Sequence, residues 1–509
     1  MQTIIEEADV VVVGSGAGGG TIACALAEAG LDVVILEEGA LVRTRDFTSD
    51  PRHALLHLYR DAGASLMFGR PPIFFSEGRC VGGSTVINGG MSWRTPERIL
   101  RRWQWQEGIE GIERDAEPLF DQVEQIVHVA PQNPGTIGQD SVRLKAGADA
   151  LGYESIDAMR SQHDCMGSNN CGFGCPTGGK QSMLVTTIPR ALAAGARLYP
   201  NCRAQRVQVE GDRAVGIEAR FEGGPGVTPG PRMQVRARHV VLSCGAVQTP
   251  ALLSRSRVGL GSGQVGRNLL SHPNGKVIGV FPDAIEGWRG TIQGWQIREF
   301  IEEGILITTT NVPPALLAMS MARRGLDVMQ ELRHYNRMLV AGCLVEDSQT
   351  GRVLTAPGGR PVMRYDLSDY DLHRILLGIS HTAEIMFAAG AERVLVPIHG
   401  FPDLRSPDDL PRLMSAQVDR RSLEVLTVHA MGTCRMGADP RQSVVDPWGQ
   451  SHEVAGLHVA DASVFPSAIG VNPQLTIMML ALRTAQAILG SVPASRTKAQ
   501  SRPSVAAKA

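Results

Sequence analysis

The feature that most constrains the fold is a glycine-rich turn between two aliphatic runs near the N-terminus. Residues 9–13 read Asp-Val-Val-Val-Val and residues 33–36 read Val-Val-Ile-Leu, both typical of buried parallel strands. Between them, residues 21–29 have the composition of a helix. The turn before this helix carries the spacing GxGxxG, formed by Gly14, Gly16 and Gly19. This order predicts a βαβ unit that binds a dinucleotide.

Each part of this unit has a physical role in holding a dinucleotide. The first glycine permits a tight turn, the second lets the backbone approach a pyrophosphate, and the third lets the helix pack on the strand. Free N–H groups at the helix N-terminus attract phosphate. Glu37 ends the second strand, where a carboxylate binds a ribose 2′-hydroxyl and disfavours NADP. The motif does not separate FAD from NAD, and the alternative is a glycine-rich turn in an unrelated α/β protein.

Charge and hydropathy exclude several classes of protein. Lys and Arg total 50 and Asp and Glu total 51, so the net charge of −1 provides no basic face for nucleic acid. Apolar residues make up 43% of the chain, enough for a large core. The apolar stretch 475–489 contains Arg483 and is shorter than the about 20 residues that span a membrane. Acidic residues stand where a secretory signal is cationic, so we expect a cytoplasmic protein, with export on a partner subunit as the alternative.

The pattern of expected strands and helices along the chain predicts two interleaved domains. Residues 276–424 alternate short strands with a helix near 369–389, which favours an α+β substrate domain built on an antiparallel sheet. The flanking segments, 1–275 and 425–490, form the dinucleotide-binding domain, so the fold class is α/β and Rossmann-like. In the first of them, residues 205–220 and 232–243 are expected to form two strands joined by a Gly/Pro loop. Residues 491–509 are rich in Ser, Ala, Arg, Lys and Pro and predict a disordered tail.

Three further blocks narrow the choice of cofactor. They are Gly78 to Gly90, Gly245 to Ser254 with Val265 to Pro273, and His429 to Gly437 with Asp461-Ala-Ser463 and Asn472-Pro473. Together with the N-terminal motif, they resemble the glucose–methanol–choline (GMC) oxidoreductase family, in the expected order from about residue 9 to 490. The resemblance implies FAD, a fold like that of p-hydroxybenzoate hydroxylase, and oxidation of an alcohol.

The resemblance also implies a set of residues that hold FAD. Those for the ADP half are Gly14, Gly16, Gly19 and Glu37; those along the pyrophosphate and flavin are Gly82, Gly83, Ser84 and Asn88; those for the phosphate and ribityl are Asp461 and Ala462; Val207 and Pro473 complete the set. Family members with covalent flavin carry a histidine near position 87. This chain has Ile87 there, so we expect non-covalent FAD.

Oxidation of an alcohol removes a hydroxyl proton and a carbon-bound hydride, and flavin N5 accepts the hydride. A base with a pKa near neutral is needed, and histidine is the natural choice. By the resemblance, His429 is this base and Asn472 is its partner, which orients the hydroxyl. The other twelve histidines are interpreted as surface or core residues, and His272 as structural or near the flavin phosphate.

Three cysteines lie close together in the spacing C-x5-C-x3-C, at Cys165, Cys171 and Cys175. A subset of the family with this spacing binds a 3Fe–4S cluster, which three cysteines suit. The alternatives are buried thiols without metal, as in a region similar to long-chain alcohol oxidases, and zinc with His163 or Asp164 as fourth ligand. A cluster would pass electrons to a protein or quinone acceptor in place of oxygen.

The leading hypothesis is therefore an FAD-dependent alcohol dehydrogenase acting on a small-molecule alcohol. The alternatives are an oxidase that makes hydrogen peroxide, a hydroxynitrile lyase with structural FAD, and a flavoprotein without catalysis. The substrate is open among lipophilic alcohols, sterols, sugars and secondary-metabolite hydroxyls, with a slight preference for a primary alcohol. Candidates for an apolar pocket are Trp288, Trp295, Phe300, Met319 and Met321.

Overall fold

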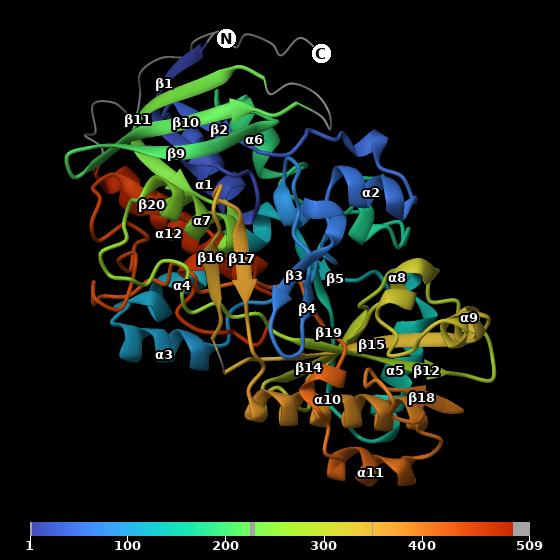
Figure 1. Cartoon of the computed structure of the whole chain (residues 1–509). Helices are drawn as coiled ribbons and strands as arrows, with labels where there is room; N and C mark the ends of the chain where they lie inside the picture. The colour runs from blue at the N-terminus through green and yellow to red at the C-terminus, as the bar shows by residue number, and fades with distance from the viewer. Residues whose placement is uncertain (1–2, 224–229, 349, 492–509) are drawn as a thin grey trace.

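Two large β-sheets organise the chain in the computed structural model, which describes residues 3–223, 230–348 and 350–491. The first sheet lies in the upper left of Figure 1 with the N-terminal strand at its centre, and the second lies at the lower right. The α/β class and the Rossmann-like dinucleotide-binding unit expected from the sequence are both confirmed. How the chain divides into domains stays a prediction.

The first sheet has seven strands in the order β8-β2-β1-β11-β10-β9, and β20 also pairs with β11. The strands that run parallel are β1 (Thr3–Val13), β2 (Val33–Leu36), β8 (Arg197–Tyr199), β11 (Arg232–Leu242) and β20 (Leu457–Val459). Antiparallel β9 (Cys202–Glu210) and β10 (Arg213–Phe221) extend it. Because parallel strands end at one edge, Gly14, Glu37 and Asp461 follow neighbouring strand ends.

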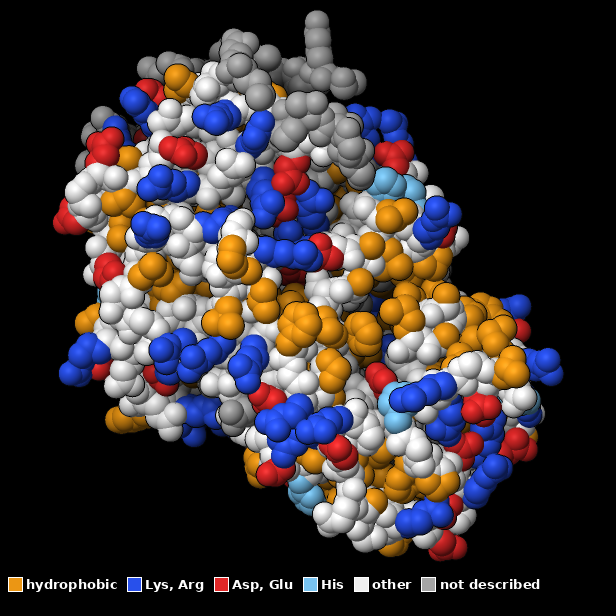
Figure 2. Space-filling model, viewed as in Figure 1, with side chains coloured by type: hydrophobic (Ala, Val, Ile, Leu, Met, Phe, Trp, Pro, Cys, Tyr) orange, Lys and Arg blue, Asp and Glu red, His pale blue; other side chains and the backbone are white. Residues whose placement is uncertain are grey.

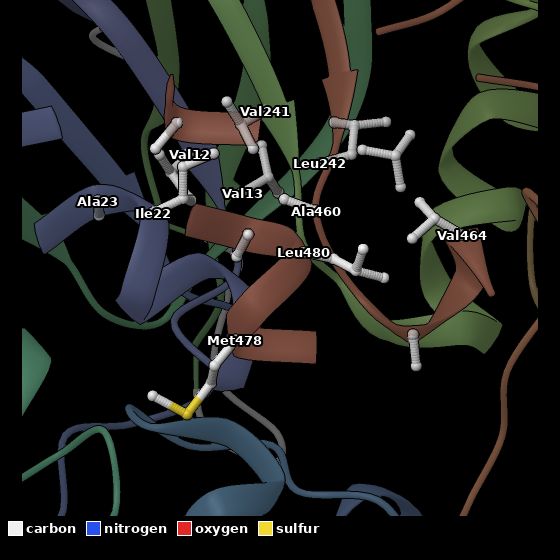
Figure 3. Packing of buried hydrophobic residues seen from close by; sticks show 14 of the residues in the cluster. Val12, Val13, Ile22, Ala23, Val241, Leu242, Ala460, Val464, Met478 and Leu480 are labelled. Atoms are coloured by element: carbon white, nitrogen blue, oxygen red, sulfur yellow. The ribbon is translucent and has the colours of Figure 1, made fainter. Parts of the chain in front are cut away.

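The core of this part lies between the sheet and two helices. Helix α1 (Ala17–Glu28) contacts α12 (Gln474–Ser491), and both are largely buried. Figure 3 shows Ile22 of α1 and Met478 of α12 beneath Val12 and Val241 of the central strands. The helix α12 therefore closes a core that the N-terminal βαβ unit begins.

The second sheet has eleven strands and supports the far side of the site. Its order is β16-β17-β3-β4-β19-β12-β15-β14-β13-β6, with β18 also paired to β12. Helix α10 (Asp369–Ala388) packs on β12, β14 and β15. The bounds are β3 (Ser65–Phe68), β4 (Ile73–Phe75), β6 (Ser155–Asp157), β12 (Asn274–Val280), β13 (Trp295–Ile297), β14 (Ile305–Thr309), β15 (Met338–Val345), β16 (Arg352–Thr355), β17 (Pro361–Arg364), β18 (Arg393–Leu395) and β19 (Val425–Thr427).

The remaining elements connect the two sheets or cover them. They are α2 (Pro51–His57), α3 (Glu97–Glu107), α4 (Ile112–Ile126), α5 (Gln139–Ala150), α6 (Thr187–Ala193), α7 (Gly245–Ser256), α8 (Pro314–Met319), α9 (Leu326–Leu332), α11 (Leu410–Ser415), and the paired strands β5 (Val129–Pro131) and β7 (Met159–Ser161). Within the described part of the chain, no helix has the length and apolar character needed to cross a bilayer.

Two features of the fold differ from the sequence-based description. The segment 205–220, expected as one strand, is the hairpin β9–β10, which turns at Gly211 and Asp212. The second sheet takes β3, β4 and β6 from the range expected in the first part of the chain, because these short strands pair with distant partners such as β17 and β19. The predicted tail falls almost wholly outside the described residues, since only Ser491, the last residue of α12, is among them.

Candidate functional site

A single cavity of about 570 Å³ runs from the glycine turn after β1 to the inner face of the second sheet. Most of the residues expected to bind the cofactor or to catalyse line it: Gly14, Gly16, Glu37, Gly83, Ser84, Asn88, His429, Asp461, Ala462, Asn472 and Pro473. Three exposed side chains that also line it, Phe74, Met319 and Val428, mark its opening. In Figure 2 hydrophobic side chains form a band across this face of the molecule.

The glycine turn is shaped by backbone contacts that leave no room for side chains. Gly14 has a φ of +101°, and a Cβ there would lie 2.2 Å from the Ser243 carbonyl oxygen. A Cβ on Gly19 would lie 2.0 Å from the carbonyl oxygen of Gly14, which explains the third glycine of the motif. Gly18 matters equally, because its Cβ would lie 1.7 Å from the Ala460 carbonyl oxygen at the end of β20. The sequence motif does not include this fourth glycine.

Glu37 is buried at the end of β2 and is held by three donors. Its carboxylate accepts from the Ser15 N–H at 3.0 Å, the Ser15 hydroxyl at 2.7 Å and the Gly39 N–H at 2.8 Å. Burial raises the pKa of Glu37, and these donors oppose that rise. Ser15 also accepts from the Gly82 N–H at 3.0 Å, so it joins the first loop to the second.

The second glycine loop lies directly against the first. A Cβ on Gly83, whose φ is +55°, would lie 2.9 Å from the Gly16 Cα. The Ser84 hydroxyl accepts from the Gly78 N–H at 2.9 Å, and Asn88 donates to Gln474 Oε1 at 2.6 Å. The buried Lys180 donates to the Val86, Asn88 and Cys171 carbonyl oxygens at 2.6–2.7 Å. Lys180, which the sequence did not single out, therefore fixes this loop.

Asp461 occupies the carboxyl end of the sheet beside the helix α7. It is buried and accepts from the Gly245 N–H at 2.9 Å, the Thr249 hydroxyl at 2.5 Å and the Ser463 N–H at 2.8 Å. Burial raises its pKa, which these donors oppose. The Asp461 side chain therefore orders the two loops whose backbone, at Gly245 and Ala462, faces the cavity.

Three residues of the predicted cofactor set do not line the cavity. Gly19 and Gly82 lie behind the two loops and shape them. Val207 is buried in β9, and its N–H donates to the Ser256 hydroxyl at 2.9 Å. The earlier residues of the same strand, Cys202, Arg203 and Ala204, line the cavity in its place.

The cavity fits FAD, with the two glycine loops at one end and Asn472 at the other. The two glycine loops bring backbone to the surface where Gly16 and Gly83 have no Cβ, and the N-terminus of α1 opens on the same space. At the other end the Asn472 Oδ1 atom is buried and has no hydrogen-bond partner among the described residues. Pro473 and Gln474, at the N-terminus of α12, also line the cavity. An anion at this position is favoured by the helix dipole.

His429, two residues after β19, and Asn472, just before α12, meet at the end of the cavity away from the glycine loops. Asn472 Nδ2 lies 3.5 Å from His429 Nε2, and both side chains are half-buried. Burial, with a contribution from His272, holds the pKa of His429 well below its usual value, so the ring is neutral at pH 7. The structure thus brings the predicted pair together at the cavity wall.

His272 completes the arrangement, which the sequence analysis did not anticipate. Its Nε2 atom accepts from the Ile469 and Gly470 N–H groups at 3.2 and 3.1 Å, and its Nδ1 lies 3.3 Å from His429 Nδ1. Burial lowers the pKa of His272 to about 3, so the ring is neutral. Because Nε2 accepts two hydrogen bonds, the proton of His272 lies on Nδ1 and points at His429.

This contact sets the resting tautomer of His429. Its Nδ1 accepts from His272, so its own proton lies on Nε2, facing Asn472. Turning the Asn472 amide by 180° lets Oδ1 accept that proton and gives the unpartnered oxygen a donor. The backbone of His272, with a φ of +45°, is held by Asp347, which accepts from the Ser271 and His272 N–H groups at 2.8 and 3.0 Å.

The described part of the structure does not support a metal site at the three clustered cysteines. The part of the chain that the structure describes contains no group of three His, Cys, Asp or Glu placed to hold a metal ion. Each sulfur has a separate partner: Cys165 contacts the Thr291 hydroxyl, Cys171 the Arg160 guanidinium and Cys175 the Lys180 N–H. The described residues therefore support neither the 3Fe–4S hypothesis nor the zinc hypothesis with His163 or Asp164.

Of the five apolar candidates for the substrate pocket, Phe300 and Met321 are core residues, Trp295 is half-buried, and Trp288 and Met319 are exposed. Met319 alone of the five lines the cavity. Trp288 stacks on Tyr335, Phe300 stacks on His381, and Met321 is buried in a small cluster beside α8. The true lining includes alternate residues of β12 and β14, namely Asn274, Lys276, Leu306 and Thr308. A period of two along these strands would have indicated them.

Comparison with protein families places this chain among flavoproteins. Two models described as GMC oxidoreductase match residues 55–274 and 348–481, and one described as FAD binding domain matches residues 9–50. Solved structures share the fold. They include pyridoxine 4-oxidase from Mesorbium loti (TM-score 0.71, 18% identity, 95% of this chain and 100% of that chain) and formate oxidase (TM-score 0.70, 16% identity, 96% and 99%).

Relatives by sequence cover nearly the whole chain. An uncharacterized GMC-type oxidoreductase of Mycobacterium tuberculosis is 36% identical over 96% of this chain and 77% of its own length. Another, of Sinorhizobium fredii, is 34% identical over 97% of both chains. A long-chain-alcohol oxidase of Arabidopsis thaliana is 27% identical over 93% of this chain and 66% of its own. This chain therefore belongs to the GMC oxidoreductase family and is an oxidoreductase with the FAD-binding fold of that family.

Proposed function

We propose that this enzyme oxidises an alcohol to an aldehyde or ketone with non-covalently bound FAD. The observation that carries the proposal is the meeting of His429 and Asn472 at the cavity wall beside the N-terminus of α12. A hydroxyl placed there contacts a neutral imidazole and an amide at once. The long-chain-alcohol oxidase relative supports an alcohol as the substrate class.

Different residues bind the cofactor, accept the proton and hold the substrate in the proposed reaction. Bound FAD supplies the acceptor for the hydride that leaves the carbinol carbon. The loops at Gly16 and Gly83, with Ser84 and Ala462, hold the cofactor by their backbone. His429 takes the hydroxyl proton at Nε2, the nitrogen toward Asn472, and the Asn472 amide holds the substrate oxygen.

The base role places a requirement on the His272–His429 pair. To accept a proton at Nε2, His429 must carry its own proton on Nδ1, which is the reverse of the resting tautomer described above. The two backbone donors to His272 Nε2 favour the resting form. His272 therefore controls how readily His429 acts as a base and is a positioning residue.

We further propose oxygen as the electron acceptor. The expectation of a protein or quinone acceptor depended on an iron–sulfur cluster at Cys165, Cys171 and Cys175, which the geometry does not fit. The relatives and neighbours whose names state an activity include the plant long-chain-alcohol oxidase, paromamine 6′-oxidase of Streptomyces fradiae and pyridoxine 4-oxidase. Oxygen uptake with hydrogen peroxide formation during turnover tests this proposal. Turnover that needs an artificial acceptor would contradict it.

The test of alcohol oxidation is anaerobic reduction of the bound flavin by a panel of primary alcohols. The His429→Ala variant should retain FAD and lose reduction by about 10²–10⁴-fold, the usual contribution of a general base. Near-normal reduction in this variant would overturn the base assignment. A wild-type flavin that no alcohol bleaches would overturn the proposed function and favour a lyase with structural FAD.

A further inference from the structure

Lys276 is a cationic side chain in the cavity wall that the proposed chemistry does not use. It lies on β12, an inner strand of the second sheet, which pairs with β15 and β19. Of the described lysines, Lys145 pairs with Asp149 and Lys180 donates to three carbonyl oxygens. For Lys276 Nζ, no hydrogen bond or ion pair exists with any residue that the structure describes.

Uncharged polar side chains surround this lysine. Gly342 of β15 is its partner in register, and Thr308 of β14 is the partner of Gly342 on the other side. The Asn274 side chain lies over Gly342, because a Cβ there would be 2.7 Å from Asn274 Oδ1. Asn274, Thr308 and Thr310 line the same cavity as Lys276. The neighbouring strands β14 and β15 therefore offer Lys276 polar groups but no carboxylate.

Charged groups on the elements packed against Lys276 are already paired. Glu424, next to β19, lines the cavity but lies 2.5 Å from His399 Nε2. Arg323, which follows α8, pairs with Asp403. Burial lowers the pKa of Lys276 to about 8, and no carboxylate opposes this shift. The amine is thus still largely protonated at pH 7, and a desolvated cation without a partner is costly unless an anion reaches it.

We propose that Lys276 binds a carboxylate on the substrate, so that the substrate is a hydroxy acid whose hydroxyl lies at His429. This rests on the proposed alcohol oxidation. Lys276 follows His272 by four residues, so their Cα atoms are at most about 14 Å apart. One linear molecule can therefore reach both groups, and the apolar side chains Leu306 and Leu344 in the cavity wall can contact its methylenes.

The experiment compares ω-hydroxycarboxylates of 6 to 12 carbons with primary alcohols of the same lengths. Steady-state turnover of the holoenzyme with a saturating electron acceptor gives a KM for each. We expect a KM at least tenfold lower for the best hydroxy acid than for its matched alcohol, the scale of a buried charge-assisted hydrogen bond. Lys276→Met should raise the hydroxy acid KM at least tenfold more than it changes the alcohol KM. Lys276→Arg, the matched control, should keep the preference.

Two measurements separate this proposal from the proposed function. Calorimetric binding of the hydroxy acid needs no turnover, so loss of affinity in Lys276→Met supports the carboxylate site even if no substrate is oxidised. Affinity in the wild type should also weaken above about pH 8, as the amine of Lys276 loses its charge. Equal KM values for acid and alcohol in the wild type, or equal effects of Lys276→Met on both, would overturn the carboxylate site while leaving alcohol oxidation in place.

Discussion

His272 Nδ1 lies 3.3 Å from His429 Nδ1, with the two rings edge to face at 86°. Only one proton fits between these two atoms. Since the Ile469 and Gly470 N–H groups occupy the other nitrogen of His272, that proton belongs to His272. The base in this site is thus controlled by a second histidine in the cavity wall.

This relationship predicts the effect of His272→Asn. Asparagine tolerates the φ of +45° at this position and offers an oxygen that accepts from a His429 Nδ1–H. His272 also contributes to the low pKa of His429, so its removal should raise that pKa. We expect the acid limb of the rate of flavin reduction to move to higher pH.

The measurement is stopped-flow reduction by a fixed alcohol between pH 5 and 9. If neither the acid limb nor the rate of flavin reduction changes in the variant, His272 does not affect the pKa or the base function of His429. The resting tautomer can be observed directly by ¹⁵N NMR of histidine-labelled wild type, in which His429 should show an unprotonated Nδ1 and a protonated Nε2.

The contact between the two glycine loops predicts a specific loss of FAD affinity in Gly83→Ala. The new Cβ would lie 2.9 Å from the Gly16 Cα and push the loops apart. The matched control is Gly152→Ala, where φ is also positive, at +74°, but nothing lies within 4 Å of the added atom. Both variants should lose about 1 kcal/mol of stability from backbone strain. Titration with FAD, followed by quenching of flavin fluorescence, should show weakened binding for Gly83→Ala alone.

The separate partners of the three cysteines predict a protein without an iron–sulfur chromophore. Protein purified without air should show flavin bands with no broad shoulder and no stoichiometric iron. The triple variant Cys165→Ser, Cys171→Ser and Cys175→Ser should have the same spectrum. Iron at about three per chain in the wild type, lost in the triple variant, would contradict the observed geometry.

Asp347 predicts a pH dependence of stability. Burial raises its pKa to about 7, against about 3.9 in an unfolded chain. Between these values the folded protein holds a proton that the unfolded chain releases, so the free energy of unfolding falls as pH rises through this window. Asp347→Asn lacks this titration. The free energy of unfolding of the wild type should therefore fall relative to that of the variant between pH 4 and 8, by an amount on the order of a few kcal/mol, as measured by denaturant titration at each pH. Parallel curves would refute the shift.

Local patterns in the sequence predicted the first sheet better than the second. The aliphatic runs of β1 and β2 and the glycines between them act within forty residues, so composition and spacing suffice. The strands β3 and β4 have three or four residues each and are fixed by pairing with β17 and β19, far along the chain. No sequence pattern within β3 or β4 predicts their pairing with β17 and β19. The β9–β10 turn does have a local signal, the pair Gly211-Asp212 between two strand-like runs, which the prediction of one strand did not use.

The residues of the candidate site also divide into those that a local sequence pattern predicted and those that depend on distant parts of the chain. Ordered motifs identified His429, Asn472 and the glycine loops, since each is a contiguous block. His272 and Lys276 lie in or just after one of these blocks, yet their roles depend on what the chain places opposite them. For His272 this is a second histidine, and Lys276 Nζ has no hydrogen-bond or ion-pair partner in the part of the chain that the structure describes. The cysteine spacing suggested a metal, but the Arg160 guanidinium that contacts Cys171 comes from a segment the motif does not contain.

The central position of β1, between β2 and β11 with β20 beyond, has a consequence for synthesis. At about 5–20 residues per second, β20 leaves the ribosome roughly 20–90 s after β1. During that interval the apolar residues of β1 and α1 lack their partners in β20 and α12. Until then the apolar surface of the N-terminal unit is exposed or is covered by chaperones. A nascent chain that stalls before residue 457 has no complete flavin pocket. Cofactor capture is therefore among the last events in the maturation of this enzyme.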